Sequence, residues 1–383
     1  MYSHHPWEEW IPGVLNKSQV QRLCNEGYIT GVDTAGKAVD LSSIDLSLSD
    51  TAFEMKDGSV KPSGQFDYDH LLQNAKLARK LEPGADGAYL LQSKATYVFK
   101  LQERLSRLVE SSVHGQATAK SSIGRVDVLS RLIVDGMDTY ESFDPDRLKG
   151  ASGNMYVEIT PITFHVKVKK GSPITQLRLF YGKPEDVEIS SKELFKTVLE
   201  GPGARDGSLT VHLENENWGG LPTAAFCARS EASIDEAVPL WVDKGKEADP
   251  CKYWRFQEAR EGRLRIEKEQ FYILRSKEKI SVPPGIAIYC RASDETIGEM
   301  RIHYAGFVHP YFGLLRNDGT KGTPLIFEVR GHQVHVSLAD GERMANLIFY
   351  RMSKDAERPE TGDDDYGSQT LKLSKFFGKW PDK

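Results

Sequence analysis

The chain of 383 residues has few cysteines, no long apolar run and no excess of positive charge. Its four cysteines lie far apart and form no CxxC pair, which argues against a disulfide framework and predicts a reduced, cytoplasmic protein. No apolar run approaches the roughly 18 residues that would span a bilayer, and the first residues lack the apolar core of a signal peptide. With 50 Lys and Arg against 55 Asp and Glu, the chain has no basic field for a nucleic-acid polymer. We therefore expect no membrane or polymer partner, but small ligands that are bound by a few well-placed groups.

Several catalytic motifs are also missing. Residues 31–38 match a phosphate-binding P-loop until Ala38, which stands where Ser or Thr must hold Mg²⁺, and we interpret them as a surface turn. The zinc deaminase signature is absent because Pro250-Cys251 is not followed by a second cysteine. Neither a GxSxG nor an HExxH motif occurs. The sequence thus predicts no zinc and no other protein-bound metal site.

The chain repeats itself. Residues 155–180 and 325–350 align without a gap at a shift of 170 positions, which places Glu158 on Glu328 and His165 on His335. Farther upstream, residues 89–94 resemble residues 272–277 at a slightly larger shift. Both copies alternate apolar and polar residues before a Gly-containing turn, as β-strands do. We infer two diverged copies of one β-rich unit, and we interpret the two histidines, which have apolar neighbours, as structural or surface residues rather than ligands.

These patterns predict a mainly β (α+β) protein with tandem distorted β-barrels and few short helices. The expected parts are a first repeat (1–182), an insertion or linker (183–264), a second repeat (265–355) and a C-terminal tail (356–383) made of a solvated loop and a terminal peptide. Asn16 is expected to cap a short helix, with Gln19 completing a capping box. Leu101, Leu105 and Leu108 share one face of a second expected helix near 100–113.

One hexapeptide combines groups that bind phosphate. Residues 120–125 read KSSIGR, which supplies two hydroxyls, a glycine-relieved backbone and a guanidinium that offers a charged fork. Asp138 follows, and Glu158 and Glu328 each lie in an apolar strand. A carboxyl group among such neighbours is either part of a structural ion pair or has a raised pKa suited to general acid–base catalysis.

The ordered set of KSSxGR, an apolar strand with Glu, and AGFxxPxFG at 305–313 resembles the dCTP deaminase and dUTPase superfamily. Residues 41–48 are similar to the early QPSSxDLRL motif of that family, with Leu41 and Ser47 as departures. The resemblance is strongest to the long, two-copy bacterial form of dCTP deaminase, and it covers roughly 12–182 and 265–352.

The resemblance implies dUTPase-like (β-clip) barrels that bind a deoxynucleoside triphosphate between neighbouring units. Ser121, Ser122 and Arg125 would hold the triphosphate, and Glu328 or Glu158 would be the general base and acid. Asp138 occupies the place of a conserved family Asp. The full set of expected nucleotide-binding residues is Lys120, Ser121, Ser122, Arg125, Asp138, Gln176, Ala305, Gly306, Phe307 and His309.

The two copies depart from the family pattern in complementary ways. The second copy has no Arg in its stretch 292–296 and has His309 where the family has Asp, whereas the first copy lacks the AGF motif. A composite site explains this division, because the first copy keeps the phosphate-binding turn and the second keeps the loop that faces the base. We therefore favour Glu328 opposite Ser121, Ser122 and Arg125, with Glu158 as the alternative.

The resemblance further implies zinc-independent hydrolytic deamination of dCTP to dUTP and ammonia, a step in the synthesis of dUTP and dTTP precursors. Mg²⁺ would arrive with the triphosphate, dUTP or dTTP could also bind, and the chain would form a homo-oligomer. The alternatives are a dUTP pyrophosphatase, a bifunctional enzyme, and a non-catalytic nucleotide-sensing protein on the same fold.

Overall fold

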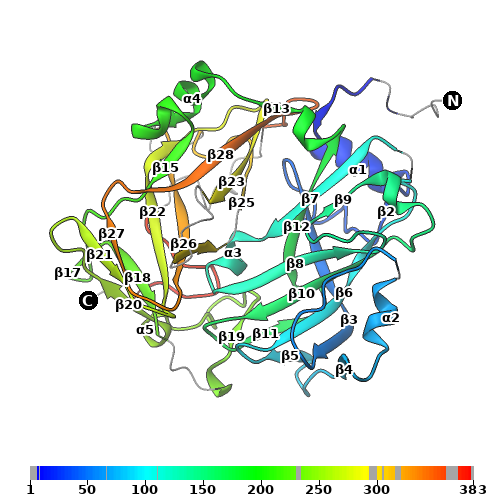
Figure 1. Cartoon of the computed structure of the whole chain (residues 1–383), viewed down its shortest axis with the longest axis horizontal. Helices are drawn as coiled ribbons and strands as arrows, with labels where there is room; N and C mark the ends of the chain where they lie inside the picture. The colour runs from blue at the N-terminus through cyan, green and yellow to red at the C-terminus, as the bar shows by residue number, and fades with distance from the viewer. Residues whose placement is uncertain are drawn as a thin grey trace.

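The computed structural model describes residues 7, 9–65, 67–109, 111–229, 234–292, 300–303, 306–314, 321–358 and 370–380 (Figure 1). Strands are the main regular structure and the helices are short, as the sequence predicts. The elements of the first half are β1 (Gly13–Val14), α1 (Lys17–Asn25), β2 (Ile29–Thr30), β3 (Ile44–Met55), α2 (Tyr68–Leu72), β4 (Ala78–Leu81), β5 (Ala88–Leu91), β6 (Thr96–Leu105), β7 (Val113–Ala119), α3 (Ser121–Gly124), β8 (Val128–Val134), β9 (Ser142–Phe143), the 3₁₀ helix η1 (Pro145–Leu148), β10 (Asn154–Pro161), β11 (Val166–Lys169) and β12 (Pro173–Tyr181).

The second half contains more short elements before its long strands. They are η2 (Pro184–Asp186), β13 (Glu188–Ile189), α4 (Lys192–Val198), β14 (Leu199–Glu200), η3 (Pro202–Arg205), β15 (Ser208–Thr210), β16 (Glu216–Trp218), β17 (Leu221–Thr223), β18 (Ala225–Ala228), η4 (Ile234–Glu236), β19 (Val238–Pro239), α5 (Pro250–Tyr253), β20 (Trp254–Gln257), β21 (Arg263–Ile266), β22 (Phe271–Ile280), β23 (Ile286–Ala292), β24 (Met300–His303), β25 (Gly306–Val308), β26 (Thr323–Gly331), β27 (Val336–Ala339) and β28 (Arg343–Arg351).

The strands form a curved, barrel-like body in each half. The large sheet of the first half has the order β8-β10-β6-β3-β12-β7-β9. The second half has two main sheets, β20-β18-β22-β26-β24 and β13-β28-β23-β25. The two halves lie side by side, and α3 sits at their junction (Figure 1). No helix in the described part of the chain is long and apolar enough to cross a membrane.

The duplication is confirmed strand by strand. The bounds of β11 and β12 recur 170 positions later as those of β27 and β28. His165 accepts a hydrogen bond through Nδ1 from the Ser93 amide (2.9 Å), and His335 accepts one from the Lys268 amide (3.2 Å), so both histidines hold a turn in place, as expected.

The expected match between residues 89–94 and 272–277 is wrong in register. Val98 lies opposite Glu158 and Ile273 lies opposite Glu328, so the counterpart of Tyr272 is Tyr97. Both tyrosine hydroxyls accept the backbone N–H of the residue five positions earlier. Residues 89–94 resemble residues 272–277 in sequence but are not their structural counterpart.

Of the two expected helices, one is present. Asn16 caps α1, and its side chain and that of Gln19 form the predicted capping box. The predicted helix near 100–113 is wrong, because this stretch begins in β6, which ends at Leu105, and continues as turns and bends over 106–109 and 111–112. Leu101, Glu103 and Leu105 are buried and alternate with exposed residues, and Glu103 is buried because it accepts hydrogen bonds from the amide and hydroxyl of Ser47.

The segment 183–264, predicted as an insertion, contributes strands to the sheets of the second half. β14 and β18 pair with β22, and β13 and β15 pair with β28. β19 pairs instead with β11 of the first half, in parallel. The segment therefore joins the two halves through backbone hydrogen bonds.

The described part of the tail, 370–380, packs against the body of the protein. Leu371, Leu373, Phe376 and Phe377 are buried in a core cluster that contains residues of both halves, and the hydroxyl of Ser374 donates to the carbonyl of Ser122 in α3 (2.7 Å). The acidic stretch 362–365 lies outside the described residues. The terminal peptide is thus part of the fold and reaches the predicted phosphate-binding turn.

Candidate nucleotide-binding site

A cavity of about 180 Å³ lies where α3 of the first half faces β25 and β26 of the second. It brings together most of the predicted site, namely Lys120, Ser121, Ser122, Arg125, Gln176, Gly306, Phe307, His309 and Glu328. The remaining lining residues are Phe312, which belongs to the AGFxxPxFG stretch, and six that the sequence did not single out, namely Asp40, Cys290, Val308, Leu325, Ile326 and Phe327. The cavity therefore has the composite character that the sequence predicts.

The phosphate-binding turn is a short helix between two strands. β7 ends at Ala119, α3 spans Ser121–Gly124, and Arg125 follows as its C-terminal cap. Ser121 is exposed, whereas Ser122 and Arg125 are buried. Lys120 forms an ion pair with Asp45 of β3. Two hydroxyls and two cationic side chains thus border one end of the cavity, and such groups bind the oxygens of a phosphate.

Glu328 lies across the cavity from this turn. It projects from β26, between β22 and β24, and is only 6% exposed. Its Oε1 lies 3.9 Å from Nε of Arg125. Burial raises the pKa of Glu328 to about 8, although the Arg125 charge acts in the opposite direction. A carboxyl group with such a pKa can both give and accept a proton near neutral pH.

Glu158 occupies the equivalent strand position but has a different environment. Its Oε1 accepts hydrogen bonds from Ser59 (3.0 Å) and from Nε of Arg131 (3.0 Å), and Oε2 accepts one from Tyr140 (3.3 Å). It does not line the cavity. Its setting is that of a structural ion pair, and the geometry favours Glu328 for proton transfer.

One other predicted nucleotide-binding residue does not line the cavity. Asp138 is exposed and pairs with Arg147 (2.5 Å), so the structure does not bring it to the α3 turn. Ala305 lies outside the described residues.

The loop that carries Phe307 and His309 is supported by a buried arginine that sequence reasoning missed. Arg178 in β12 is fully buried, donates to the carbonyl of Ile288 (2.8 Å) and lies 4.0 Å from the centre of the Phe307 ring. Ser42 forms a hydrogen bond with Nδ1 of His309 (2.9 Å), and burial lowers the pKa of that histidine. The only signal in the sequence was a single arginine within the apolar run Leu177–Phe180.

A second feature that the sequence did not reveal connects the α3 turn to strand β26. Asp127, two residues after Arg125, accepts hydrogen bonds from Arg330 (2.8 Å) and Thr163 (2.5 Å). Arg330 stands two residues after Glu328 in β26. We name Asp127, Thr163 and Arg330 the cross-copy brace. It joins the phosphate-binding turn of one copy to the glutamate strand of the other and fixes their relative position.

The described residues contain no group of three or more His, Cys, Asp or Glu side chains that could hold a metal ion. What the cavity does contain is a polar, cationic end, the three aromatic side chains of Phe307, Phe312 and Phe327, and the buried carboxyl group of Glu328 with its raised pKa. This arrangement suits a phosphorylated ring compound whose reaction requires general acid–base catalysis.

Comparisons with known proteins agree with this chemistry. The model of the 2′-deoxycytidine 5′-triphosphate deaminase N-terminal domain matches residues 11–183, and the C-terminal domain model of the same enzyme matches residues 189–377. The crystal structure of 2′-deoxycytidine 5′-triphosphate deaminase from Agrobacterium tumefaciens is similar, with a TM-score of 0.78 and 25% identity over 90% of this chain and 97% of that one.

Two dUTPase structures are more distant. The native dUTPase of EIAV has a TM-score of 0.19 and 16% identity over 28% of this chain and 84% of that one. A mutant dUTPase from phage phi11 of S. aureus also has a TM-score of 0.19, with 13% identity over 41% of this chain and 97% of that one. A search among curated proteins found no match.

Proposed function

The chain belongs to the 2′-deoxycytidine 5′-triphosphate deaminase family, and we propose that it converts dCTP and water to dUTP and ammonia without zinc. The observation that carries this proposal is the position of Glu328. Its buried carboxyl group, with a pKa raised to about 8, faces Arg125 and the α3 turn within one cavity. The product would supply the synthesis of thymidine nucleotide precursors.

In the proposed complex, Ser121, Ser122 and Arg125 bind the triphosphate. Mg²⁺ accompanies the phosphates and is not held by a protein cage, which agrees with its preference for phosphate oxygens and water. Phe307, which Arg178 holds in place, borders the cytosine ring. The ring is thereby placed with its C4 toward Glu328.

The reaction moves the two protons of one water molecule in turn. Glu328 takes a proton from the water as its oxygen forms a bond to C4 of cytosine, and it passes this proton to N3 of the ring. The same carboxylate then takes the proton of the new C4 hydroxyl group and gives it to N4, so that C4=O forms, the C4–N4 bond breaks and ammonia leaves. A single carboxyl group with a raised pKa can serve both steps, and such catalysis typically contributes about 10²–10⁴-fold to the rate.

The test is to incubate the purified protein with dCTP and Mg²⁺ and to follow ammonia release and nucleotide identity by chromatography, with and without a zinc-selective chelator. We expect chelator-resistant formation of dUTP. Glu328→Gln should reduce turnover by at least about 10²-fold, whereas the matched Glu158→Gln variant should retain most of it.

The other outcomes are equally informative. Formation of dUMP and pyrophosphate alongside dUTP would show a bifunctional enzyme. Intact binding of dCTP without turnover would refute the catalytic proposal and indicate a nucleotide sensor. Equal loss in the Glu158→Gln and Glu328→Gln variants would refute the assignment of Glu328 as the residue that transfers the proton.

A further inference from the structure

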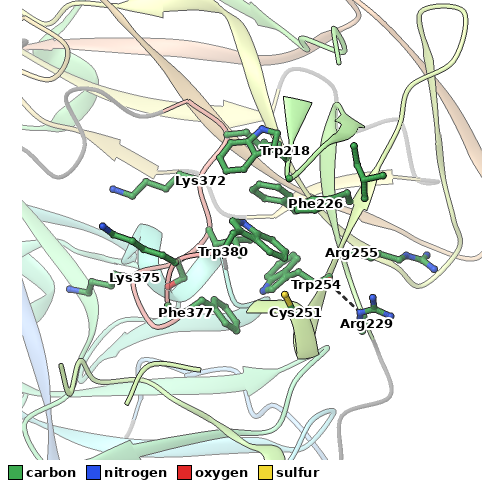
Figure 2. A pocket seen from close by; sticks show the side chains of 18 of the residues that line it. Trp218, Phe226, Arg229, Cys251, Trp254, Arg255, Lys372, Lys375, Phe377 and Trp380 are labelled. Atoms are coloured by element: carbon green, nitrogen blue, oxygen red, sulfur yellow. Dashed lines mark hydrogen bonds between the residues drawn. The ribbon is translucent and has the colours of Figure 1, made fainter. Parts of the chain in front are cut away.

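A second and larger cavity, of about 920 Å³, lies between strands β16–β18 and β20 and the C-terminal segment 370–380 (Figure 2). It shares no lining residue with the cavity that contains Glu328. Small-molecule sites in proteins typically measure roughly 300–1,000 Å³. The second cavity therefore has room for a ligand of nucleotide size, and we name it the tail cavity.

Aromatic rings dominate the interior of the tail cavity. The strands and the tail contribute six of them, Trp218, Phe226, Trp254, Phe256, Phe377 and Trp380. The ring centroids of Phe256 and Trp380 lie 4.5 Å apart, and Trp218 packs edge-on against Phe226 with a centroid distance of 5.2 Å. Trp218 and Trp380 are only half-buried. Partly exposed indole rings can stack on a planar ligand, and stacking accepts any nucleobase.

The charged residues that line the tail cavity all have one sign, although the carboxylate of Glu216, outside the lining, accepts a hydrogen bond from the Trp218 indole (3.3 Å). Five lining residues are cationic, Arg229, Arg255, Lys372, Lys375 and Lys379, and among the described residues no Asp or Glu lines the cavity. This contrasts with the net charge of −5 of the whole chain. Figure 2 shows Lys372 and Lys375 on one side of the aromatic cluster and Arg229 and Arg255 on the other. The cavity thus attracts an anion to an aromatic surface.

The first copy shows that the fold does not require such a cavity. Phe53 of β3 lies opposite Val98 of β6, just as Phe226 of β18 lies opposite Ile273 of β22. In the first copy, α2 covers this face, and Phe53 belongs to a buried cluster with Tyr68 and Leu72. In the second copy, the segment 370–380 covers the equivalent face and leaves the tail cavity beneath it.

We propose that the tail cavity is a second ligand site, which takes a nucleoside 5′-polyphosphate. Its base stacks on the half-buried indole rings of Trp218 and Trp380, and its phosphates lie toward the lysines of the segment 370–380. This inference concerns binding alone and does not depend on deamination at Glu328.

The test is calorimetric titration of the full chain carrying Arg125→Ala, which removes the guanidinium of the first cavity, with ATP as the probe. We expect saturable binding of one ATP per chain. Adenosine, which lacks phosphate, and tripolyphosphate, which lacks a ring, should each bind at least tenfold more weakly.

Further substitutions in that background locate the site. Lys375→Ala with Lys379→Ala should weaken ATP binding at least fivefold, and both lysines are exposed, so the fold should tolerate their loss. The matched control is Lys252→Ala, which removes an exposed lysine of α5 that does not line the cavity. Trp380→Leu should abolish binding, whereas Trp380→Phe, which keeps a ring, should preserve it.

Three results would overturn the proposal. One is the absence of saturable binding for all four ribonucleoside triphosphates. Another is binding to the unsubstituted chain that Arg125→Ala abolishes, which would place the nucleotide in the first cavity. The third is a dimer that Trp380→Leu dissociates without any nucleotide binding, which would show that a second copy of the chain covers the tail cavity.

Discussion

Removal of Arg330 from the cross-copy brace should destabilise the protein in a pH-dependent way. The Asp127 side chain is fully buried and that of Arg330 is only 11% exposed, so Arg330→Met leaves a buried carboxylate without its counter-charge. Breaking one partner of a buried ion pair typically costs about 3–5 kcal/mol. We expect about 3 kcal/mol here at pH 8, because the hydrogen bond from Thr163 remains.

The sign of the pH dependence follows from the pKa of Asp127. Burial already raises this pKa to about 6, and Arg330 lowers it, so loss of Arg330 raises it further. A carboxyl group with a raised pKa stabilises the fold in its protonated form and loses that contribution as the pH rises. The cost of Arg330→Met should therefore be small at pH 5 and fully present at pH 8.

Urea denaturation of the single and double variants at both pH values measures this effect. Asp127→Asn combined with Arg330→Met should recover most of the loss, because replacing both partners removes the unpaired charge. The control is Lys170→Met, which removes an exposed partner of Asp50 and should change little. A cost no larger than that of the control, or one equal at pH 5 and pH 8, would refute the reasoning.

Three further predictions concern the site. The kcat/KM for dCTP should rise about tenfold per pH unit up to about pH 8, because Glu328 must be ionised to act as a base. Arg125→Gln should move this rise to higher pH, because the Arg125 charge lowers the pKa of Glu328. A pH profile that is flat between pH 6 and 9 would contradict this. Glu328→Gln should become more stable than the unsubstituted protein as the pH rises from about 5 to 8, by up to the order of 4 kcal/mol, because the pKa of Glu328 is raised in the folded state; denaturation at each pH measures the difference, and a constant difference would exclude it. Ser374→Ala should cost about 1 kcal/mol of stability and raise the KM for dCTP, because it removes the hydrogen bond to the carbonyl of Ser122; steady-state kinetics with Ser353→Ala as a distant control would show whether the effect is specific to the turn.

The features that could be predicted from the sequence depend on residues that are close together in the chain or repeat at a fixed spacing. The KSSIGR turn, the capping box of Asn16 and Gln19 and the shift of 170 positions each depend on local spacing. The composite cavity was also within reach, since each copy keeps only one of the two motifs.

The remainder depended on contacts between distant residues. The prediction of a helix near 100–113 failed because Leu101, Leu105 and Leu108 have helical spacing. The alternation typical of a strand passes through Glu103, and a buried glutamate at that position requires the hydrogen bonds from Ser47 of another strand. Arg178 and the Asp127–Arg330 pair look like ordinary charged residues until the two halves are packed together.

The different fates of Glu158 and Glu328 have an evolutionary consequence. In one copy the glutamate is held by Arg131, and in the other it faces the Arg125 of its neighbour. Under the proposed catalytic assignment, the first copy supplies the phosphate-binding turn and the second supplies the proton-transferring Glu328. Neither copy can therefore catalyse the reaction without the other. A gene duplication of this kind is irreversible, because a single copy can no longer rebuild the site by pairing with itself. Selection then acts on the two halves as different parts of one enzyme, and their sequences are free to diverge wherever the shared cavity does not need them.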